Sequence, residues 1–259
     1  MIQPEPDPLS AEFHVASRNL GAYKGMFKAH EVHYEPFVQQ LVTTAPLHLD
    51  GYPRITLPPP VPVRMPVEDA IRGRASGRAF GDRPLSAAEL GTLLRFANGV
   101  QHTRTIGTEP VFYRRPAPNS GDLGSVEIFP IALNVDGVPT GIYHFDTVHH
   151  DIARLYGGEF RSWLREVVLY QLELVEAAVA FVLTAAVGRL QAKYGLRGYR
   201  FALLDVGHVS ENLYLVGTGL GLQICATAGF VDDELDARLG LDGLDVASML
   251  VVLAGTTRS

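Results

Sequence analysis

The pattern of hydrophobic and polar positions predicts a chain in which helices and strands alternate. Apolar residues at helical spacing predict short helices over residues 66–72, 86–98, 159–171, 187–194 and 232–239, and a long buried helix over residues 201–219. Apolar runs with few polar interruptions predict strands over residues 126–135, 141–145, 177–184, 222–226 and 247–253. Strands that alternate with helices indicate an α+β or α/β layered domain.

Local signals fix several expected boundaries. Ser86-Ala87-Ala88-Glu89 has the sequence of a capping box, in which the serine and glutamate side chains bind backbone amides at the start of a helix. Asp136-Gly137 between two apolar runs predicts a hairpin turn. Consecutive prolines over residues 57–62 forbid a helix. We therefore place a boundary there, between an N-terminal extension (residues 1–56) and a core domain (residues 57–259).

The composition restricts the class of protein. A chain of 259 residues, 47% apolar and 19% charged, can bury a large core, which excludes a disordered linker or a disulfide-stapled miniprotein. The net charge of −6 argues against nucleic acid or an anionic membrane as a partner. The longest apolar stretch, residues 177–187, is too short to span a bilayer. The acidic, proline-rich start and the single cysteine predict a cytoplasmic protein.

The first candidate for chemistry is a cluster of arginines around Ser76. Five arginines lie within twenty residues against three acids, although the chain as a whole is acidic. Guanidinium groups and a hydroxyl, here those of Arg74, Ser76 and Arg78, can together bind the oxygens of a phosphate. Taken alone, the cluster is better explained as a solvated basic loop.

A second candidate is the turn of small residues and prolines over residues 116–124. Such residues let backbone amides approach a flat ligand closely, and Asn119 and Ser120 can hydrogen-bond to it. An ordinary turn before a strand explains the same residues.

A third candidate is Lys193-Tyr194, at the end of a predicted helix in a chain with 19 arginines and only three lysines. An ammonium beside a phenol favours the phenolate, which would move Tyr194 toward use as a base. Favourable charge at a helix C-terminus, worth about 0.3 to 1 kcal/mol, explains the lysine equally well.

Other polar residues predict no site. The group His144, Asp146, His149, His150 and Asp151 is interpreted as the solvated end of a hairpin rather than as a set of metal ligands. Cys225 is interpreted as a small core residue. No phosphate-binding glycine loop and no nucleophile-elbow motif occurs at a strand-to-helix junction, which argues against a nucleoside triphosphatase or a serine hydrolase.

Taken in chain order, these segments resemble the SagB-type dehydrogenases, a branch of the flavin-dependent nitroreductase superfamily that includes the azoline oxidases of peptide natural-product pathways. The resemblance extends from about residue 52 to the C-terminus. It rests on Arg74-x-Ser76-x-Arg78-x-Phe80, on the turn from Pro118 to Gly121 with Glu127, on Lys193-Tyr194-Gly195-x-Arg197-Gly198-Tyr199-Arg200, and on residues 207–213 and 229–232.

The resemblance implies that the protein binds FMN. Arg74, Ser76 and Arg78 would hold the FMN phosphate, and Arg258 would add a further charge. The implied fold is α+β: a nitroreductase-like FMN-binding fold with a mixed central sheet flanked by helices. The family is expected to form a domain-interlocked homodimer with two FMN sites at the subunit interface.

The same resemblance implies roles for the remaining candidates. Asn119 and Ser120 would line the ribityl chain or the isoalloxazine ring, and the backbone amide of Gly229 would lie near flavin N5. Lys193 and Tyr194 match the Lys-Tyr pair implicated in azoline oxidation.

The chain departs from the family pattern in two places. Where relatives carry Pro-Ser-x-Gly followed by Tyr-Pro, this chain has Asn119 at the serine position and Gly124-Ser125 at the aromatic pair, which would alter the flavin pocket or the substrate entrance. Ala75 replaces a second arginine before the phosphate-binding serine, so Arg258 would gain importance.

The implied reaction is the two-electron oxidation of a peptide thiazoline or oxazoline to a thiazole or oxazole, with Tyr194 as the base assisted by Lys193. A cyclodehydratase would supply the modified peptide substrate within a synthetase complex. One alternative is an NAD(P)H-dependent nitro or quinone reductase that uses the same pocket. The other is a catalytically silent scaffold subunit of a peptide-modifying complex.

Overall fold

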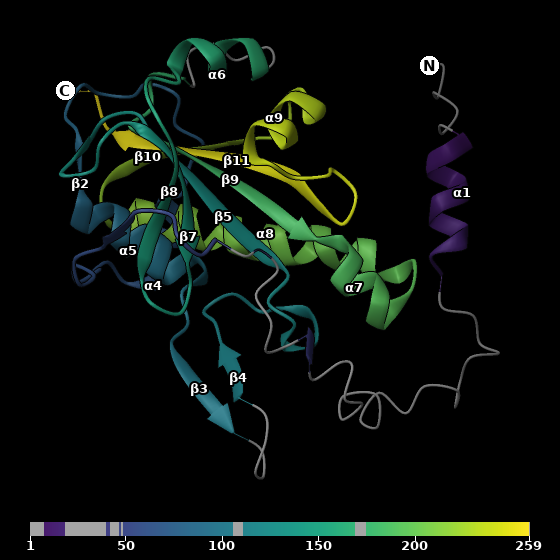
Figure 1. Ribbon diagram of the computed structural model, residues 1–259. Helices are drawn as coiled ribbons and strands as arrows, with labels where there is room; N and C mark the ends of the chain where they lie inside the picture. The colour runs from purple at the N-terminus through teal and green to yellow at the C-terminus, as the bar shows by residue number, and fades with distance from the viewer. Residues whose placement is uncertain are drawn as a thin grey trace, which may run out of the picture.

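A seven-stranded sheet forms the centre of the protein, with helices on both faces (Figure 1). The computed structural model describes residues 8–18, 40–41, 47, 49–105, 111–168 and 175–258. In sheet order the strands are β1 (Arg54–Thr56), β8 (Asp151–Gly157), β7 (Gly141–Asp146), β5 (Val126–Ala132), β9 (Val179–Ala186), β11 (Val246–Thr256) and β10 (Leu222–Thr227).

The seven strands pair antiparallel throughout, whereas a mixed sheet was expected. Parallel pairing occurs at two other places. The short strands β2 (Leu85–Ser86) and β6 (Val135–Asp136) pair in parallel, and Ser76 forms a parallel bridge with Ile224 of β10. The Ser76 bridge attaches the arginine-rich loop to the edge of the sheet.

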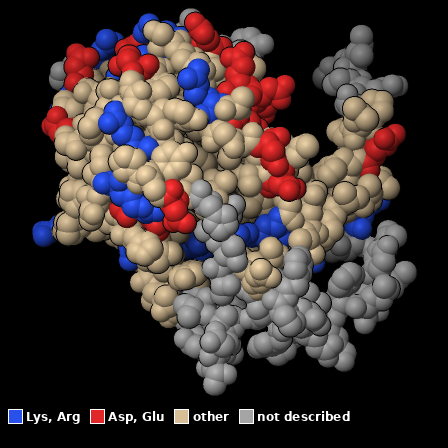
Figure 2. Space-filling view, viewed as in Figure 1, with Lys and Arg blue, Asp and Glu red and all other residues tan. Residues whose placement is uncertain are grey.

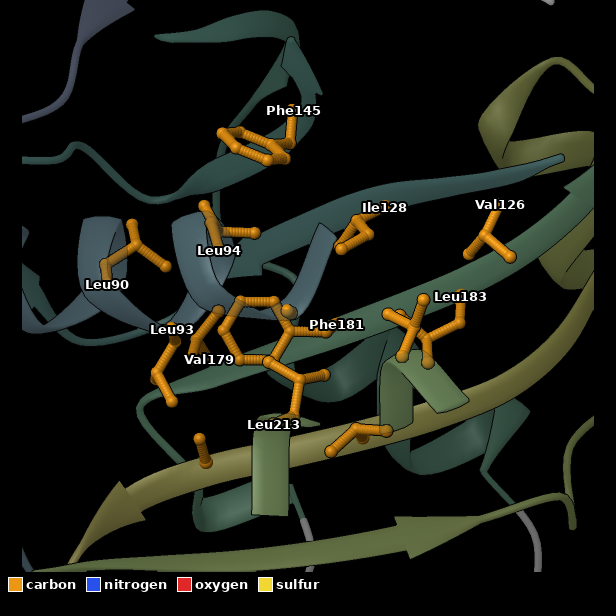
Figure 3. Packing of buried hydrophobic residues seen from close by; sticks show 14 of the residues in the cluster. Leu90, Leu93, Leu94, Val126, Ile128, Phe145, Val179, Phe181, Leu183 and Leu213 are labelled. Atoms are coloured by element: carbon orange, nitrogen blue, oxygen red, sulfur yellow. The ribbon is translucent and has the colours of Figure 1, made fainter. Parts of the chain in front are cut away.

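Two helices cover one face of the sheet and form the larger part of the core. They are α5 (Ala87–Asn98) and α8 (Arg197–Gly219), with α4 (Val67–Gly73) beside α8. Figure 3 shows Leu93 of α5 and Leu213 of α8 on either side of Phe181, a β9 residue with no exposed surface. The helices reach this position because their apolar residues recur every three or four positions.

The opposite face is covered by two shorter helices, α6 (Arg161–Val167) and α9 (Asp232–Leu239) (Figure 1). Leu164 of α6 and Leu235 of α9 are fully buried against apolar residues of β5, β9 and β11. Because β9 has buried side chains on both faces, it is apolar along its whole length.

The remaining elements lie at the ends of the sheet. They are α1 (Pro8–Ala16), a 3₁₀ turn (Ser120–Asp122), the antiparallel pair β3 (His102–Thr105) and β4 (Val111–Arg114), and α7 (Val187–Tyr194), which links β9 to α8. None of the described helices combines the length and the apolar character that a bilayer span requires.

The N-terminal helix α1 is attached to the first turn of α8. Arg200 donates from Nε to the Ser17 hydroxyl at 2.8 Å and from Nη2 to the His14 carbonyl at 2.6 Å. Arg197 donates to the Ser17 carbonyl at 3.2 Å. The rings of Phe13 and Tyr199 meet edge to face with centroids 5.3 Å apart.

Most of the predicted elements are confirmed, and the differences have local causes. The first strand of the predicted hairpin ends at Ala132, because the amides of Leu133 and Asn134 both turn to the Ala178 carbonyl at 2.9 Å. β8 was missed because Asp151 and Arg154 interrupt its apolar residues. Of the helix predicted over residues 159–171, the structure has Arg161–Val167, and residues 169–171 lie outside the described residues.

Candidate functional site

Lys193 and Tyr194, at the end of α7, pack on the turn that carries Asn119 and Ser120. A Cβ atom on Gly121 would overlap both the Tyr194 hydroxyl and the Lys193 ammonium nitrogen. Gly121 also has a φ of 64°, in the left-handed region that favours glycine. The Lys193 nitrogen lies 5.2 Å from the centre of the Tyr194 ring. The fold therefore joins two of the three candidate segments, although more than seventy residues separate them in the sequence.

A buried carboxylate on α8 holds this turn in place. Asp205 is 2% exposed and accepts hydrogen bonds from the Ser120 hydroxyl at 2.8 Å and the Ser125 hydroxyl at 2.7 Å. The Ser120 amide donates to the same carboxylate at 3.1 Å. Asn119 accepts a bond from the Gly124 amide at 3.1 Å, which closes the turn. The turn is thus a preformed structure in which the amide and the hydroxyl of Ser120 both bond to Asp205.

The electrostatic setting of the Lys-Tyr pair differs from the sequence-based expectation. Burial raises the pKa of Tyr194, and the carboxylates of Asp205 and Asp122 raise it further. Burial lowers the pKa of Lys193 against the opposing effect of Asp122. The expectation that Lys193 promotes a Tyr194 phenolate is therefore wrong in direction. The pair favours a neutral phenol beside an amine that loses its proton more readily than an ordinary lysine.

The arginine-rich loop forms a second group of candidates around Tyr214 of α8. The Ser76 hydroxyl lies 3.0 Å from the Tyr214 hydroxyl, which also accepts a bond from the Ala226 amide at 2.8 Å. The Arg74 guanidinium lies over the Tyr214 ring, 5.4 Å from its centre. Gly77 donates its amide to the Ile224 carbonyl at 2.9 Å. Tyr214 therefore fixes the loop to both α8 and β10.

The C-terminal end of the chain lies beside the same loop. Phe80 bridges to Thr257, which brings Arg258 next to the residues that follow Arg78. Among the described residues, neither Arg74 nor Arg258 has a carboxylate partner, and Arg258 is exposed. The Arg74 guanidinium on the loop of Ser76, and Arg258 on the segment that bridges to this loop, fit an anionic group such as a phosphate.

Gly229 lies beyond the far end of β10 from this loop. Gly229 is five positions after Ile224 and two positions after the end of β10, which is a span of at most roughly 16 Å. Its amide donates to the Thr227 hydroxyl at 3.1 Å. An amide at this place can donate to a ligand ring only if it gives up or shares the bond to Thr227.

The two groups of candidates occupy opposite sides of α8. Asp205 and Tyr214 are nine residues apart, which corresponds to about two and a half turns and about 13 Å along the helix. At the level of Asp205, α8 exposes Leu203, Leu204 and Gly207 to solvent. The structure does not bring the Lys-Tyr group and the arginine group together within one chain.

The histidines of the group contact different partners. His144 is 8% exposed, contrary to the expectation of a solvated position, and its Nε2 lies 2.6 Å from Glu127 Oε2. His149 contacts Asp146, and His150 faces the carbonyl of Pro58 at 3.2 Å. No group of three or more potential ligands gathers within the described ranges of the chain. Cys225 is buried in the core, as expected.

Sequence reasoning missed two residues that organise the site, Asp205 and Tyr214. Both lie on the long helix, which was predicted from its apolar residues without reference to these two. The available signal was the presence of a carboxylate between Leu204 and Val206, because a buried charge requires partners. No comparable signal distinguishes Tyr214 from a core aromatic residue.

Comparisons with known proteins agree on one family. Residues 71–255 match the model of the nitroreductase family. Over 169 residues the chain is 31% identical to MJ1384 of Methanocaldococcus jannaschii, which is named as a nitroreductase, covering 65% of this chain and 81% of that protein. It is 28% identical over 152 residues to the microcin B17-processing protein McbC of Escherichia coli, covering 57% of this chain and 56% of McbC. The chain thus spans little more than half of McbC.

Solved structures share the fold. A protein of Anabaena variabilis, named as a nitroreductase, superposes with a TM-score of 0.70 at 25% identity, covering 82% of this chain and 43% of that one. A chain of the E. coli microcin synthetase McbBCD complex, solved with truncated pro-MccB17 bound, superposes with a TM-score of 0.62 at 21% identity, covering 98% and 95%. A protein of Exiguobacterium sibiricum solved in complex with FMN gives a TM-score of 0.53 at 14% identity, covering 75% and 90%.

Proposed function

This chain belongs to the nitroreductase family, and from that premise we propose that it is an FMN-dependent dehydrogenase that oxidises thiazolines or oxazolines in a peptide to thiazoles or oxazoles. The observation that carries the proposal is the packing of Lys193 and Tyr194 on the Gly121 turn. That packing supplies a proton acceptor and a proton donor side by side. The similarity to the microcin B17-processing protein McbC supports a modified peptide as the substrate.

The residues around the arginine loop fit FMN. Arg74 and Arg258 supply positive charge that no described carboxylate neutralises, and Ser76 adds a hydroxyl, so these residues would hold the phosphate. Arg78 lies exposed on the same loop. β10 leads from this loop to Gly229, whose amide would then face the ring. The core domain of residues 57–259 would thus supply the cofactor site, while the end of the extension, Arg54–Thr56, adds strand β1 to its sheet.

A homodimer would complete the site. Leu203 and Leu204 of α8 are 48% and 57% exposed, and a Cβ on Gly207 would meet nothing within 4 Å. This open apolar stripe suits close packing against a second copy of the chain. A twofold axis through the stripe would place the arginine group of one chain opposite the Lys-Tyr group of the other. Asn119 and Ser120 would then line the flavin bound by the partner chain.

The proposed chemistry divides the substrate's two hydrogens between the cofactor and the chain. When bound, FMN supplies a two-electron acceptor for the hydride that leaves the heterocycle. Lys193, whose pKa is lowered by burial, takes the proton from the ring carbon next to the carbonyl. Tyr194, whose pKa is raised by burial, stays protonated and donates a hydrogen bond to the substrate. This assignment makes Lys193 the base, in place of the Tyr194 base expected from sequence.

A synthetase complex is the proposed setting for the reaction. An azoline forms by cyclodehydration of a peptide, so the substrate must come from a cyclodehydratase. The superposition on a chain of the McbBCD complex supports an assembly of this kind at the level of the fold. The competing proposal is an NAD(P)H-dependent reductase of nitro compounds or quinones, which the similarity to MJ1384 favours.

Spectroscopy of the purified protein tests the proposal. We expect a yellow protein whose flavin absorption is bleached, without oxygen, by an azoline-containing peptide and only slowly by NADPH. Rapid bleaching by NADPH alone would establish the reductase. A colourless protein that FMN does not reconstitute would leave only the scaffold role.

Arg74→Ala should release FMN during gel filtration, whereas the control Arg72→Ala should retain it. Arg72 is an exposed arginine on α4 that pairs with Asp69 instead of facing Tyr214. Equal retention in both variants would remove Arg74 from the phosphate site.

A further inference from the structure

A cavity of about 510 Å³ lies between α8, α9 and the beginning of β11. Four of its lining residues are aspartates: Asp232, Asp233, Asp236 and Asp245. Figure 2 shows acidic side chains gathered over the region of α9. The cavity is therefore strongly negative at neutral pH.

The chain itself does not neutralise this charge. Within the described residues, none of the four aspartates forms an ion pair with an arginine, a lysine or a histidine. The dipole of α9 stabilises the negative charges of Asp232 and Asp233, which lie in its first turn. Asp236 accepts one bond from the Ser248 amide at 2.8 Å. These contacts leave carboxylate oxygens available to a cationic ligand.

A second feature of the cavity points to a hydrogen-bond donor. Ser248 lines the cavity and is 5% exposed, and its buried hydroxyl has no hydrogen-bond partner in the described part of the chain. Buried hydroxyls are nearly always bonded, so an unpartnered one marks a place for a ligand group. Gln191 and Tyr199 add further polar atoms to the wall.

The rest of the wall is apolar. Val187 and Met249 line the cavity with carbon atoms, and these would pack against the aliphatic stem of a long basic side chain. A metal ion is a poorer occupant, because no group of three potential ligands is present among the described residues. An organic cation on an apolar stem would match both the acidic and the apolar residues that line the cavity.

The position of the cavity connects it with the candidate cofactor site. Ala228 and Phe230, the two chain neighbours of Gly229, both line it. We propose that this cavity binds the guanidinium or ammonium group of a basic residue that lies close to the heterocycle in the peptide substrate. The proposal rests on the proposed function, since it assigns a substrate class to the same site.

Binding of a small cation tests the cavity without relying on turnover. In calorimetric titrations of the purified full-length protein, Nα-acetyl-arginine methylamide should bind at least tenfold more tightly than its neutral isostere Nα-acetyl-citrulline methylamide. Added salt should weaken the binding of the arginine compound, because part of it is electrostatic. Equal affinities for the two compounds would overturn the proposal.

Matched variants locate the effect. Asp233→Asn combined with Asp245→Asn should abolish the preference for arginine, since both residues line the cavity. Glu234→Gln removes one negative charge from an exposed position of α9 that does not line the cavity, so it should keep the preference, as neither single cavity variant is expected to do fully. A preference that survives the double variant would place the cation elsewhere and reject this cavity.

A pair of substrates separates this inference from the proposed function. Azoline peptides with arginine or citrulline beside the ring should bleach the flavin at rates that differ at least tenfold at low peptide concentration. Equal bleaching by both peptides would contradict the assignment of the cavity and would leave the proposed dehydrogenase activity supported. If neither peptide bleached the flavin while the titration still favoured the arginine compound, the proposed dehydrogenase activity would be contradicted and the cation site would be supported.

Discussion

At Gly121 the absence of a side chain is itself part of the candidate site. The residue has a left-handed backbone, and its missing Cβ leaves room for the ends of Lys193 and Tyr194. Asn119 and Ser120 owe their position to this turn and to Asp205. Small changes here should therefore affect chemistry more than folding.

Gly121→Ala should slow substrate-dependent flavin reduction about tenfold or more, because the new methyl group displaces Lys193 and Tyr194 from their contact with the turn. The control is Gly137→Ala, which has a similar backbone strain at a φ of 79° but only an ordinary contact with Ala87. Both variants should lose about 1 kcal/mol of stability in urea unfolding. Equal loss of activity in both would mean that strain alone is responsible.

The pH dependence of the reaction tests Lys193 as the base. Because burial lowers the pKa of Lys193, the rate of flavin reduction should rise with pH through a value below the 10.5 of an ordinary lysine. In Lys193→Ala this rise of the rate with pH should disappear. In Tyr194→Phe the rise should remain, although the rate should be lower at every pH. FMN content, measured by absorbance, should match the parent protein in both variants. A rise that persists in Lys193→Ala assigns the base to another group.

At the level of elements, local signals predict most of the fold. The helices over residues 187–194 and 232–239 match their predicted ranges, because Gly195 ends the first and aspartates begin the second. β1, β3 and β4 were not predicted, because each is short and its pattern is not distinctly apolar. The hydrophobic pattern also does not predict the order of the strands, because the place of β8 between β1 and β7 depends on tertiary pairing.

The candidate site was only partly predictable for the same reason. Lys193 and Tyr194 were identified as a pair, and the pattern of the 116–124 turn was recognised. Their contact depends on the way α7 and α8 fold back past the turn, which no local spacing encodes. The sign of the Tyr194 pKa shift depends on Asp205 and Asp122, which approach through the fold.

The start of α5 offers a test of an element boundary. The Ser86 hydroxyl accepts a bond from the Glu89 amide at 3.1 Å, and Glu89 Oε2 accepts one from the Ser86 amide at 2.7 Å, which confirms the capping box. Ser86→Ala should lower the free energy of unfolding by about 1 kcal/mol, while Ser86→Thr keeps most of it. Urea denaturation measures the change in unfolding free energy of both variants, and the dependence of that free energy on urea concentration should stay unchanged. An alanine variant as stable as the parent would show that α5 does not depend on its cap.

The edge strand β1 is held by an ion pair that should make stability depend on pH. Arg54 contacts Asp146 at 2.9 Å and also pairs with Asp151. Burial alone would raise the pKa of Asp146, but hydrogen bonds from His149 and Arg54 lower it to about 2. A pKa below the usual 3.8 means that the contribution is complete above about pH 4 and is lost as the pH falls toward 2.

Asp146→Asn should therefore cost about 1 to 2 kcal/mol near neutral pH, with solvent screening taken into account, and progressively less between pH 4 and pH 2. The control Asp69→Asn, which breaks an exposed pair with Arg72, should change stability little at any pH. Thermal unfolding across this pH range provides the measurement. A stability difference that stays constant down to pH 2 would contradict the Asp146 assignment.

At the scale of the whole molecule, α8 links the two groups of candidate residues to one surface. Asp205 and Tyr214 project from opposite sides of the helix, and the exposed stripe of Leu203, Leu204 and Gly207 lies at the level of Asp205 along its axis. In the proposed homodimer, FMN binding would depend on association of two chains. Disrupting the stripe should therefore affect a site that it does not touch.

Leu204→Glu should convert the protein to a monomer in sedimentation velocity and reduce its FMN content, because charge on the stripe opposes close packing. Val148→Glu is the matched control, since Val148 is exposed in the turn between β7 and β8, away from α8. That control should remain dimeric and yellow. A Leu204→Glu protein that is still a dimer with full FMN content would rule out this face as the interface.

The attachment of α1 has a consequence for how this protein can diverge. Arg197 and Arg200 bind α1 largely through main-chain carbonyl oxygens, which every amino acid presents alike. Phe13 packs on Tyr199, and Ser17, just after the end of α1, accepts a bond from Arg200 through its side chain. A substitution at an exposed position of α1 such as Val15 can therefore leave the bonds from Arg197 and Arg200 in place.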